Sequence, residues 1–177
     1  PPDAAVIKAQ WARADADHPL ATFDTDAAAM QRRIEGQATW GEEGDRQRQP
    51  GSDEIYTIRL RNGIEFRLSG LHVMTKETRH WQWVSLWWSD LPDSDFGADR
   101  PDVFAELEPV WSRYKMCAIS GYKEEDQAAA ESMSEFPSLR DAIAATQGGV
   151  GKPTWCSNPY MEHGRNNAGT NCIGCHQ

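Results

Sequence analysis

The chain has 177 residues, a length typical of one domain, and 39% of them are hydrophobic, including eight tryptophans, so it can bury a core. Its formal net charge is −9, which argues against nucleic-acid binding, because phosphates require a basic face. No apolar run is long enough to span a membrane. An acidic surface of this kind favours a partner protein with a basic docking patch, because opposite charges steer association.

The first predicted element is a helix over residues 3–14. Asp3 is its candidate N-cap, and Ile7 and Trp11 are four positions apart, so they share one helical face. The segment ends before Pro19, which cannot continue a helix.

A second helix is predicted over residues 25–36. Thr25 or Asp26 supplies its N-cap, and Met30 and Ile34 lie on the same face. A polar surface loop then leads to the strands.

The clearest strand signal is a hairpin around Arg61-Asn62-Gly63. A two-residue Asn-Gly turn would put the apolar residues of its two arms on opposite faces. A three-residue loop with Gly63 in the left-handed region pairs Leu60 with Ile64 and puts them on one side, so it is preferred. The six apolar residues are Tyr56, Ile58, Leu60, Ile64, Phe66 and Leu68.

The second arm of this hairpin is expected to continue through His72, on the same face as Phe66 and Leu68. Two more strands are predicted, at residues 81–88 and 114–120. A capped helix follows at residues 138–146, and Gly148-Gly149 ends it.

The last residues carry the strongest motif, Cys172-Ile173-Gly174-Cys175-His176. This Cys-x-x-Cys-His pattern is typical of covalent c-type haem attachment. The two thiols each add to a haem vinyl group, and His176 then supplies the proximal imidazole to the iron. One covalent haem c is therefore the predicted cofactor.

The cysteines have two alternative interpretations. A zinc site would use Cys172 and Cys175 with Cys156, His163 or His176, but it lacks a second well-spaced cysteine pair. A redox dithiol normally lies in a βαβ unit, and the sequence contains no such pattern. The haem interpretation is favoured over both.

Together these elements predict one haem-binding domain, residues 1–177, of the α+β class, in which an antiparallel β-sheet has flanking helices. The haem-binding segment lies at the C-terminus. The predicted parts are N-terminal helices at 3–36, a β-rich middle at 54–120, and a helix with the haem-attachment segment at 137–177.

Haem attachment of this kind takes place outside the bacterial cytoplasm, so the protein is expected to be periplasmic or secreted, its targeting segment removed from or left out of this sequence. That compartment is oxidising. A disulfide is therefore predicted between Cys117 and Cys156, the two cysteines that the haem does not use. Two separate buried thiols are the alternative.

Four segments carry a family resemblance: Val6-Ile7-Lys8-Ala9-Gln10-Trp11, Leu71-His72-Val73-Met74-Thr75-Lys76, Trp81-Gln82-Trp83, and the terminal Cys172-Ile173-Gly174-Cys175-His176. In these the chain resembles uncharacterised secreted bacterial monohaem cytochrome-c-like proteins. The resemblance covers most of the chain and implies a periplasmic haem protein, without indicating a substrate. This chain departs from the group in ending one residue after His176.

A weaker similarity is to the β-fold cytochromes c′, which also carry a late attachment motif on a sheet-based domain. In those proteins the distal face of the haem can be open to small ligands such as nitric oxide. The similarity is limited to the late motif and the β-rich middle.

A six-coordinate iron needs a distal ligand from upstream of Cys172. His72 is the preferred candidate, because a haem could complete the core on its strand face and the resemblance retains this position. Met161 and Met116 are the runners-up, and a core histidine bonded to a backbone carbonyl is the structural alternative. The full set of upstream donors is His18, His72, His80, His163, Met30, Met74, Met116, Met133 and Met161.

An acidic loop follows the tryptophan-rich strand. Carboxylates at this density can bind calcium, but they do not complete an EF-hand loop, so a solvated acidic loop is favoured over a calcium site. The aspartates are Asp90, Asp93, Asp95 and Asp99.

Two functions follow from these residues. The preferred one is an electron-transfer protein, because the chain has one haem motif and no second catalytic motif, so the chemistry belongs to the cofactor. The alternative is a five-coordinate haem protein that binds or converts a small ligand such as NO, CO, peroxide or hydroxylamine.

Overall fold

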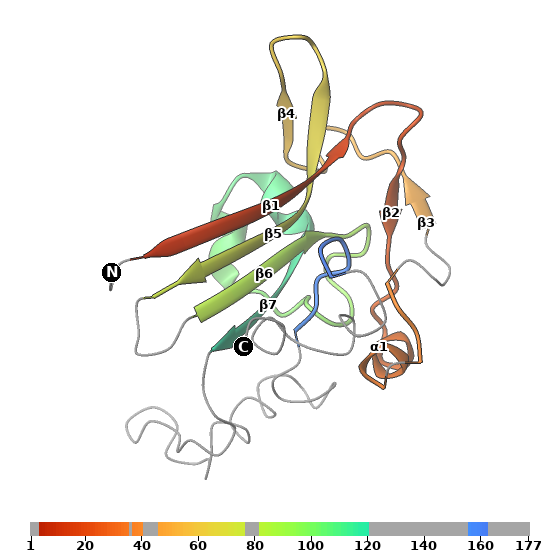
Figure 1. Ribbon diagram of the computed structural model, residues 1–177, viewed down its shortest axis with the longest axis vertical. Coiled ribbons are helices and arrows are strands. Elements are labelled where there is room, and N and C mark those ends of the chain that lie inside the picture. The colour runs from red at the N-terminus through yellow and green to blue at the C-terminus, as the bar shows by residue number, and fades with distance from the viewer. Residues whose placement is uncertain (1–3, 36, 41–45, 77–81, 121–155, 163–177) are drawn as a thin grey trace.

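The computed structural model describes residues 4–35, 37–40, 46–76, 82–120 and 156–162 (Figure 1). Of these described residues, 38% lie in strands and 15% in helices, the sheets are antiparallel, and there is one α-helix among them. The predicted α+β fold with flanking helices was therefore wrong. Strand pairing between distant segments, rather than helix packing, organises this domain.

The main sheet contains five antiparallel strands, and its path runs β1-β5-β6-β7, with β4 pairing beside β5. β5 is the longest strand, and it pairs with β1, β4 and β6. The bounds are β1 (Ala5–Arg13), β4 (Thr57–Arg59), β5 (Glu65–Thr75), β6 (Gln82–Trp88) and β7 (Tyr114–Ser120). Within the described residues, no helix is long and apolar enough to cross a membrane.

The segment predicted as the first helix is strand β1, which pairs with β5 along its whole length. A spacing of four positions, as between Ile7 and Trp11, places two residues on one face of a strand as well as of a helix. The alanines of the segment favoured a helix by local propensity alone. Pairing with β5, more than 50 residues away, overrides that propensity.

The predicted hairpin is confirmed. Ile58 is paired with Phe66, and the N–H of Leu60 donates to the carbonyl of Ile64 at 2.8 Å. Gly63 has a φ of +84°, the left-handed conformation that the three-residue loop requires. The predicted strands at 81–88 and 114–120 are also confirmed, as β6 and β7.

A bulge interrupts the pairing of β1 with β5. Gln10 is opposite Gly70, but Trp11 is opposite Leu68, so Ser69 is the extra residue. Because Gln10 and Trp11 point to opposite faces of β1, Leu68 and Gly70 also belong to opposite faces of the sheet. The expectation that His72 shares a face with Phe66 and Leu68 was therefore wrong.

The predicted second helix is α1 (Ala27–Ile34), and its N-cap is Asp26, whose carboxylate accepts the N–H of Ala29. It lies in the sequence between β2 (Leu20–Thr22) and β3 (Arg46–Arg48), which pair antiparallel as a separate two-stranded sheet (Figure 1). The buried guanidinium of Arg33 lies over the ring of Trp40 at 4.2 Å.

Two 3-10 turns, η1 (Asp102–Glu106) and η2 (Pro109–Arg113), connect β6 to β7. Tyr114, which follows them, is fully buried, and its hydroxyl donates to the carbonyl of Leu68 at 2.7 Å. The same oxygen accepts the N–H of Tyr56 at 3.2 Å. Burial raises the pKa of this phenol well above its ordinary value.

The predicted disulfide is confirmed, because Cys117 in β7 is bonded to Cys156. This bond holds residues 156–162, drawn in blue in Figure 1, against the sheet. The helix predicted at residues 138–146 lies outside the described residues.

Candidate functional site

The site is the face of the sheet that carries His72, called here the His72 face. Residues paired across antiparallel strands point to the same side, so the registers define three rows on it. The rows are Val6, Met74, Trp83 and Ile119; then Lys8, His72, Ser85 and Cys117; then Gln10, Gly70, Trp87 and Lys115.

Residues 156–162 lie across this face. The side-chain amide of Asn158 donates to the Ser85 hydroxyl at 3.0 Å and to the Leu86 carbonyl at 2.8 Å. Asn158 is fully buried, and the disulfide from Cys156 to Cys117 fixes the start of the segment. The segment is thus anchored to β6 and β7 by directional contacts as well as by packing.

Gly70 gives the segment room to approach the sheet. A Cβ atom at Gly70 would lie only 3.0 Å from Met161 Cγ and 3.1 Å from Asn158 Oδ1. Such distances are shorter than ordinary contacts, so a glycine is needed here by close approach of the chain. Met161 is consequently held directly over β5, two positions along the strand from His72.

His72 is 7% exposed, and its Nε2 atom lies 3.8 Å from Oε1 of Glu162. The other oxygen of Glu162 accepts a hydrogen bond from the backbone N–H of Asn158. The imidazole is therefore in the middle of the sheet with a carboxylate beside it. The backbone N–H of Asn158 thereby helps to orient the Glu162 carboxylate.

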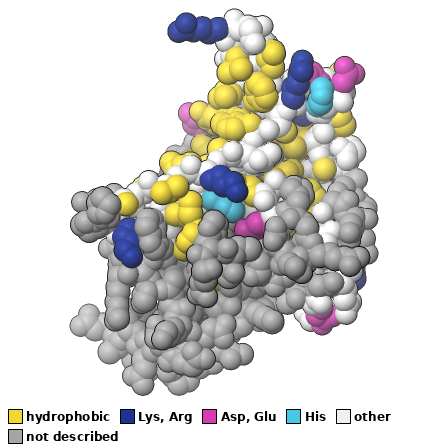
Figure 2. Space-filling view, viewed as in Figure 1, with side chains coloured by type: hydrophobic (Ala, Val, Ile, Leu, Met, Phe, Trp, Pro, Cys, Tyr) yellow, Lys and Arg dark blue, Asp and Glu magenta, His cyan; other side chains and the backbone are white. Residues whose placement is uncertain are grey.

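An apolar row borders His72 on one side. Val6, Met74 and Trp83 are partly exposed hydrophobic residues, and Ile119 at the end of the row is buried. In the space-filling view, hydrophobic side chains gather on this side of the molecule, next to a small group of histidine, basic and acidic side chains (Figure 2). A porphyrin needs an imidazole or thioether donor beside an apolar wall, and this face offers both.

The three predicted distal ligands lie on two different faces of the sheet. It brings His72 and Met161 together on the His72 face. Met116 follows Lys115 and precedes Cys117 in β7, so it points to the opposite face of the sheet. The predicted attachment residues Cys172, Cys175 and His176 lie outside the described residues, as do the upstream donors His80, Met133 and His163.

The length of chain between this face and the attachment motif can be bounded. Glu162 precedes Cys172 by ten positions. Ten residues span at most about 35 Å when fully extended. The ten-residue connection is therefore long enough for a haem joined to Cys172 to reach His72.

Two of the four carboxylates of the predicted calcium loop are engaged by arginines. Asp90 accepts two hydrogen bonds from Arg46, at 3.1 and 3.2 Å, and forms an ion pair with Arg48 at 3.1 Å. Asp93 forms an ion pair with Arg100 at 2.5 Å. Within the described part of the chain, no group of three or more His, Cys, Asp or Glu side chains could hold a metal ion. Asp95 and Asp99 make up the rest of the predicted set.

Lys115, at the end of the third row, is 1% exposed. Its ammonium group donates to the hydroxyl of Thr25 at 2.6 Å. Burial lowers the pKa of Lys115 to about 8, although the carboxylates of Asp95, Asp24 and Asp90 oppose the shift. In the sequence, Lys115 resembles an ordinary exposed strand residue, so only the structure identifies it as a buried cation.

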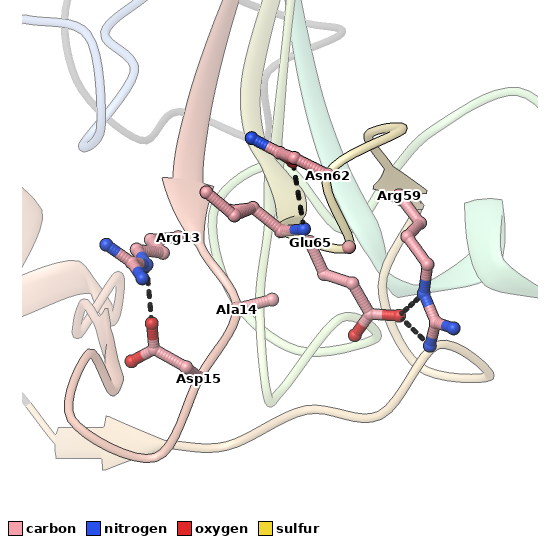
Figure 3. A pocket seen from close by; sticks show the side chains of 8 residues that line it. Arg13, Ala14, Asp15, Arg59, Asn62 and Glu65 are labelled. Carbon is pink, nitrogen blue, oxygen red and sulfur yellow. Dashed lines mark hydrogen bonds and ion pairs between the residues drawn. The ribbon is translucent and has the colours of Figure 1, made fainter.

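A separate polar cavity of about 340 Å³ lies at the turn of the β4–β5 hairpin (Figure 3). Its two guanidinium groups are paired locally: Arg13 with Asp15 at 2.6 Å, and Arg59 with Glu65 at 2.5 Å. Because these arginines already have carboxylate partners, an anionic ligand would have to displace them. The cavity is therefore a weaker candidate than the His72 face.

Glu162 and Asn158 belong to the site, and the sequence did not identify them as members. Their only signal was proximity to Met161, in a segment whose residues follow no periodic pattern. Comparisons with protein families, with characterised proteins and with solved structures found no match for this chain.

Proposed function

We propose that this protein is a periplasmic or secreted c-type cytochrome that carries one covalent haem and transfers single electrons. Cys172 and Cys175 would form the thioether bonds, and His176 would be the proximal ligand. The observation that carries this proposal is the Cys-x-x-Cys-His motif itself, in which three chemically specific positions have the spacing of haem attachment. The confirmed Cys117–Cys156 disulfide agrees with an oxidising compartment.

His72 is the proposed distal ligand. The support is its position as a buried imidazole on the His72 face, bordered by Met74 and Trp83 and within covalent reach of Cys172. Met161, on the same face, is the second candidate. Two imidazole ligands would give the iron a lower reduction potential than one imidazole and one thioether.

In this proposal the haem supplies the redox chemistry when bound, and the chain supplies its environment. Trp83, Met74 and Val6 would supply the apolar border of the haem site and so influence the reduction potential. The net charge of −9 favours a redox partner with a basic docking patch.

One observation favours the alternative of a five-coordinate haem protein. The Nε2 atom of His72 lies 3.8 Å from Glu162, so the imidazole already has a charged neighbour within the chain. If His72 keeps that neighbour, the iron's sixth position remains open to a small ligand such as nitric oxide or carbon monoxide.

The attachment test uses the full chain, expressed with haem-ligation machinery. We expect a coloured protein whose mass exceeds that of the polypeptide by one haem, and a pyridine haemochrome typical of two thioether bonds. Cys172→Ala and Cys175→Ala should each remove one thioether bond. The matched control, Cys117→Ser with Cys156→Ser, should keep both. A colourless parent protein with the mass of the bare polypeptide would rule the proposal out.

The reduced optical spectrum separates the two functions. A low-spin spectrum that does not change with carbon monoxide supports electron transfer. A high-spin spectrum that shifts with carbon monoxide supports ligand binding instead.

A further inference from the structure

Strand β1 forms an exposed edge of the main sheet. It pairs with β5 on one side, and within the described residues no strand pairs with its other side. It has nine residues and contains no proline or glycine. Ile7 is 67% exposed and Val6 is 49% exposed. Long, apolar edges of this kind are templates for pairing with another strand.

The hydrogen bonds at the two ends of β1 fix the direction of its backbone groups. The N–H of Lys76 donates to the carbonyl of Ala4, and the N–H of Ala14 donates to the carbonyl of Glu65, both at 2.9 Å. Even-numbered residues of β1 therefore direct their backbone groups toward β5. The odd-numbered residues direct theirs outward: Ala5, Ile7, Ala9, Trp11 and Arg13.

We propose that β1 pairs antiparallel with β1 of a second copy of this chain, about a two-fold axis at Ala9. In this register every residue of the strand has a partner. Ala9 faces the partner's Ala9, and Ile7 faces the partner's Trp11, so a β-branched and an aromatic side chain meet twice in the dimer. The outward backbone groups of both strands then satisfy one another.

The charges of β1 favour the register centred on Ala9 over a register centred on Lys8. Lys8 faces the partner's Gln10, and Arg13 faces the partner's Ala5, so no like charges lie directly opposite. A register centred on Lys8 would oppose two ammonium groups, which is destabilising. A register centred on Ile7 would leave the last residues of both strands unpaired.

The proposed pairing also extends an apolar surface. Ile7 begins a row with Val73, Val84 and Ala118 on the face opposite His72. The partner's Trp11 and Ala9 would continue that face across the two-fold axis. A second copy is thus favoured over an acidic foreign strand, which would leave Ile7 without an apolar neighbour.

The test measures the molar mass of the full chain by sedimentation over a range of concentrations. We expect a reversible monomer–dimer equilibrium. Ile7→Thr should weaken association by about tenfold, because each dimer loses the Ile7–Trp11 pair twice. The matched control is Val103→Thr. Val103 is also an exposed β-branched residue, 52% exposed, but it lies in η1, so its substitution should leave association unchanged.

Ala9→Pro tests the backbone contacts. The Ala9 N–H points outward, so proline removes no hydrogen bond to β5 and is tolerated at a strand edge. It should abolish the dimer while the monomer keeps its circular dichroism spectrum. If this variant unfolds, the effect of Ile7→Thr on association is the deciding measurement. A parent protein that stays monomeric at every concentration, or association that survives Ile7→Thr undiminished, overturns the proposal.

Cysteine cross-linking tests the register. Directly opposed residues of a hydrogen-bonded antiparallel pair have Cα atoms about 5.5 Å apart, within disulfide range. Ala9→Cys should therefore give a cross-linked dimer on mild oxidation, whereas Ile7→Cys, which faces the partner's Trp11, should not. Equal cross-linking of the two variants would exclude the Ala9-centred register.

Discussion

Nε2 of His72 lies 3.8 Å from a carboxylate oxygen of Glu162, although the two residues are 90 positions apart in the sequence. This contact joins the middle of β5 to the last described segment before the attachment motif. It also places a candidate iron ligand beside the segment that precedes the attachment motif in the sequence. Single substitutions on this face can therefore identify the distal ligand.

The first prediction concerns the distal ligand. His72→Ala should convert the reduced spectrum of the haem-loaded protein from low-spin to high-spin, because the iron loses its sixth ligand, and carbon monoxide should then bind. Met161→Leu should leave the spectrum low-spin.

Met116→Leu is the matched control for this pair, because Met116 points to the opposite face of the sheet. It should change neither the spectrum nor carbon monoxide binding. The reverse pattern, with a low-spin His72→Ala protein and a high-spin Met161→Leu protein, would assign the ligand to Met161.

The second prediction concerns the close approach at Gly70. Gly70→Ala should lower the free energy of unfolding by about 1–3 kcal/mol, because the new Cβ would crowd Met161 and Asn158. Urea denaturation measures the change. Met161→Ala should relieve part of the crowding, so the two substitutions together should cost less than the sum of their separate costs. Strict additivity would show that Met161 is not over Gly70.

The third prediction concerns the disulfide, which closes a loop between residues 39 positions apart. Replacing Cys117 and Cys156 by serine should lower the free energy of unfolding by about 4 kcal/mol, since the denatured chain gains conformational freedom. Reduction of the parent protein should reproduce the loss measured by denaturation of the variant. A change within experimental error in both would mean that the anchor contributes no stability.

The fourth prediction is a pH dependence from Lys115, whose pKa falls from an ordinary value of 10.5 to about 8 in the folded chain. Between these values the unfolded chain binds more protons than the folded one, so stability rises with pH. The free energy of unfolding should therefore increase from pH 8 toward pH 10. Lys115→Met should remove this slope. A slope of the same size in the variant would assign it to other groups.

The local parts of the fold could be predicted from the sequence. The hairpin around Gly63 and the cap of α1 at Asp26 depend on residues a few positions apart, so their patterns were sufficient. The disulfide was also predicted correctly, because the haem motif uses two of the four cysteines and leaves only Cys117 and Cys156 to pair.

Two other predictions failed for reasons that no local pattern contains. Residues 5–13 form a strand because β5 is available to pair with them. The bulge at Ser69 then moves Leu68 to the face opposite Gly70, which reversed the environment expected for His72.

By itself, the sequence determined the chemistry that the chain can support: two thiols and an imidazole with the spacing of haem attachment, and an acidic surface. The tertiary structure alone decided which donors meet, bringing His72, Met161 and Glu162 together and turning Met116 away. The physical reason is that residue spacing is a property of the local chain. Strand register, bulges and the path of a disulfide-anchored segment depend instead on contacts between residues far apart in it.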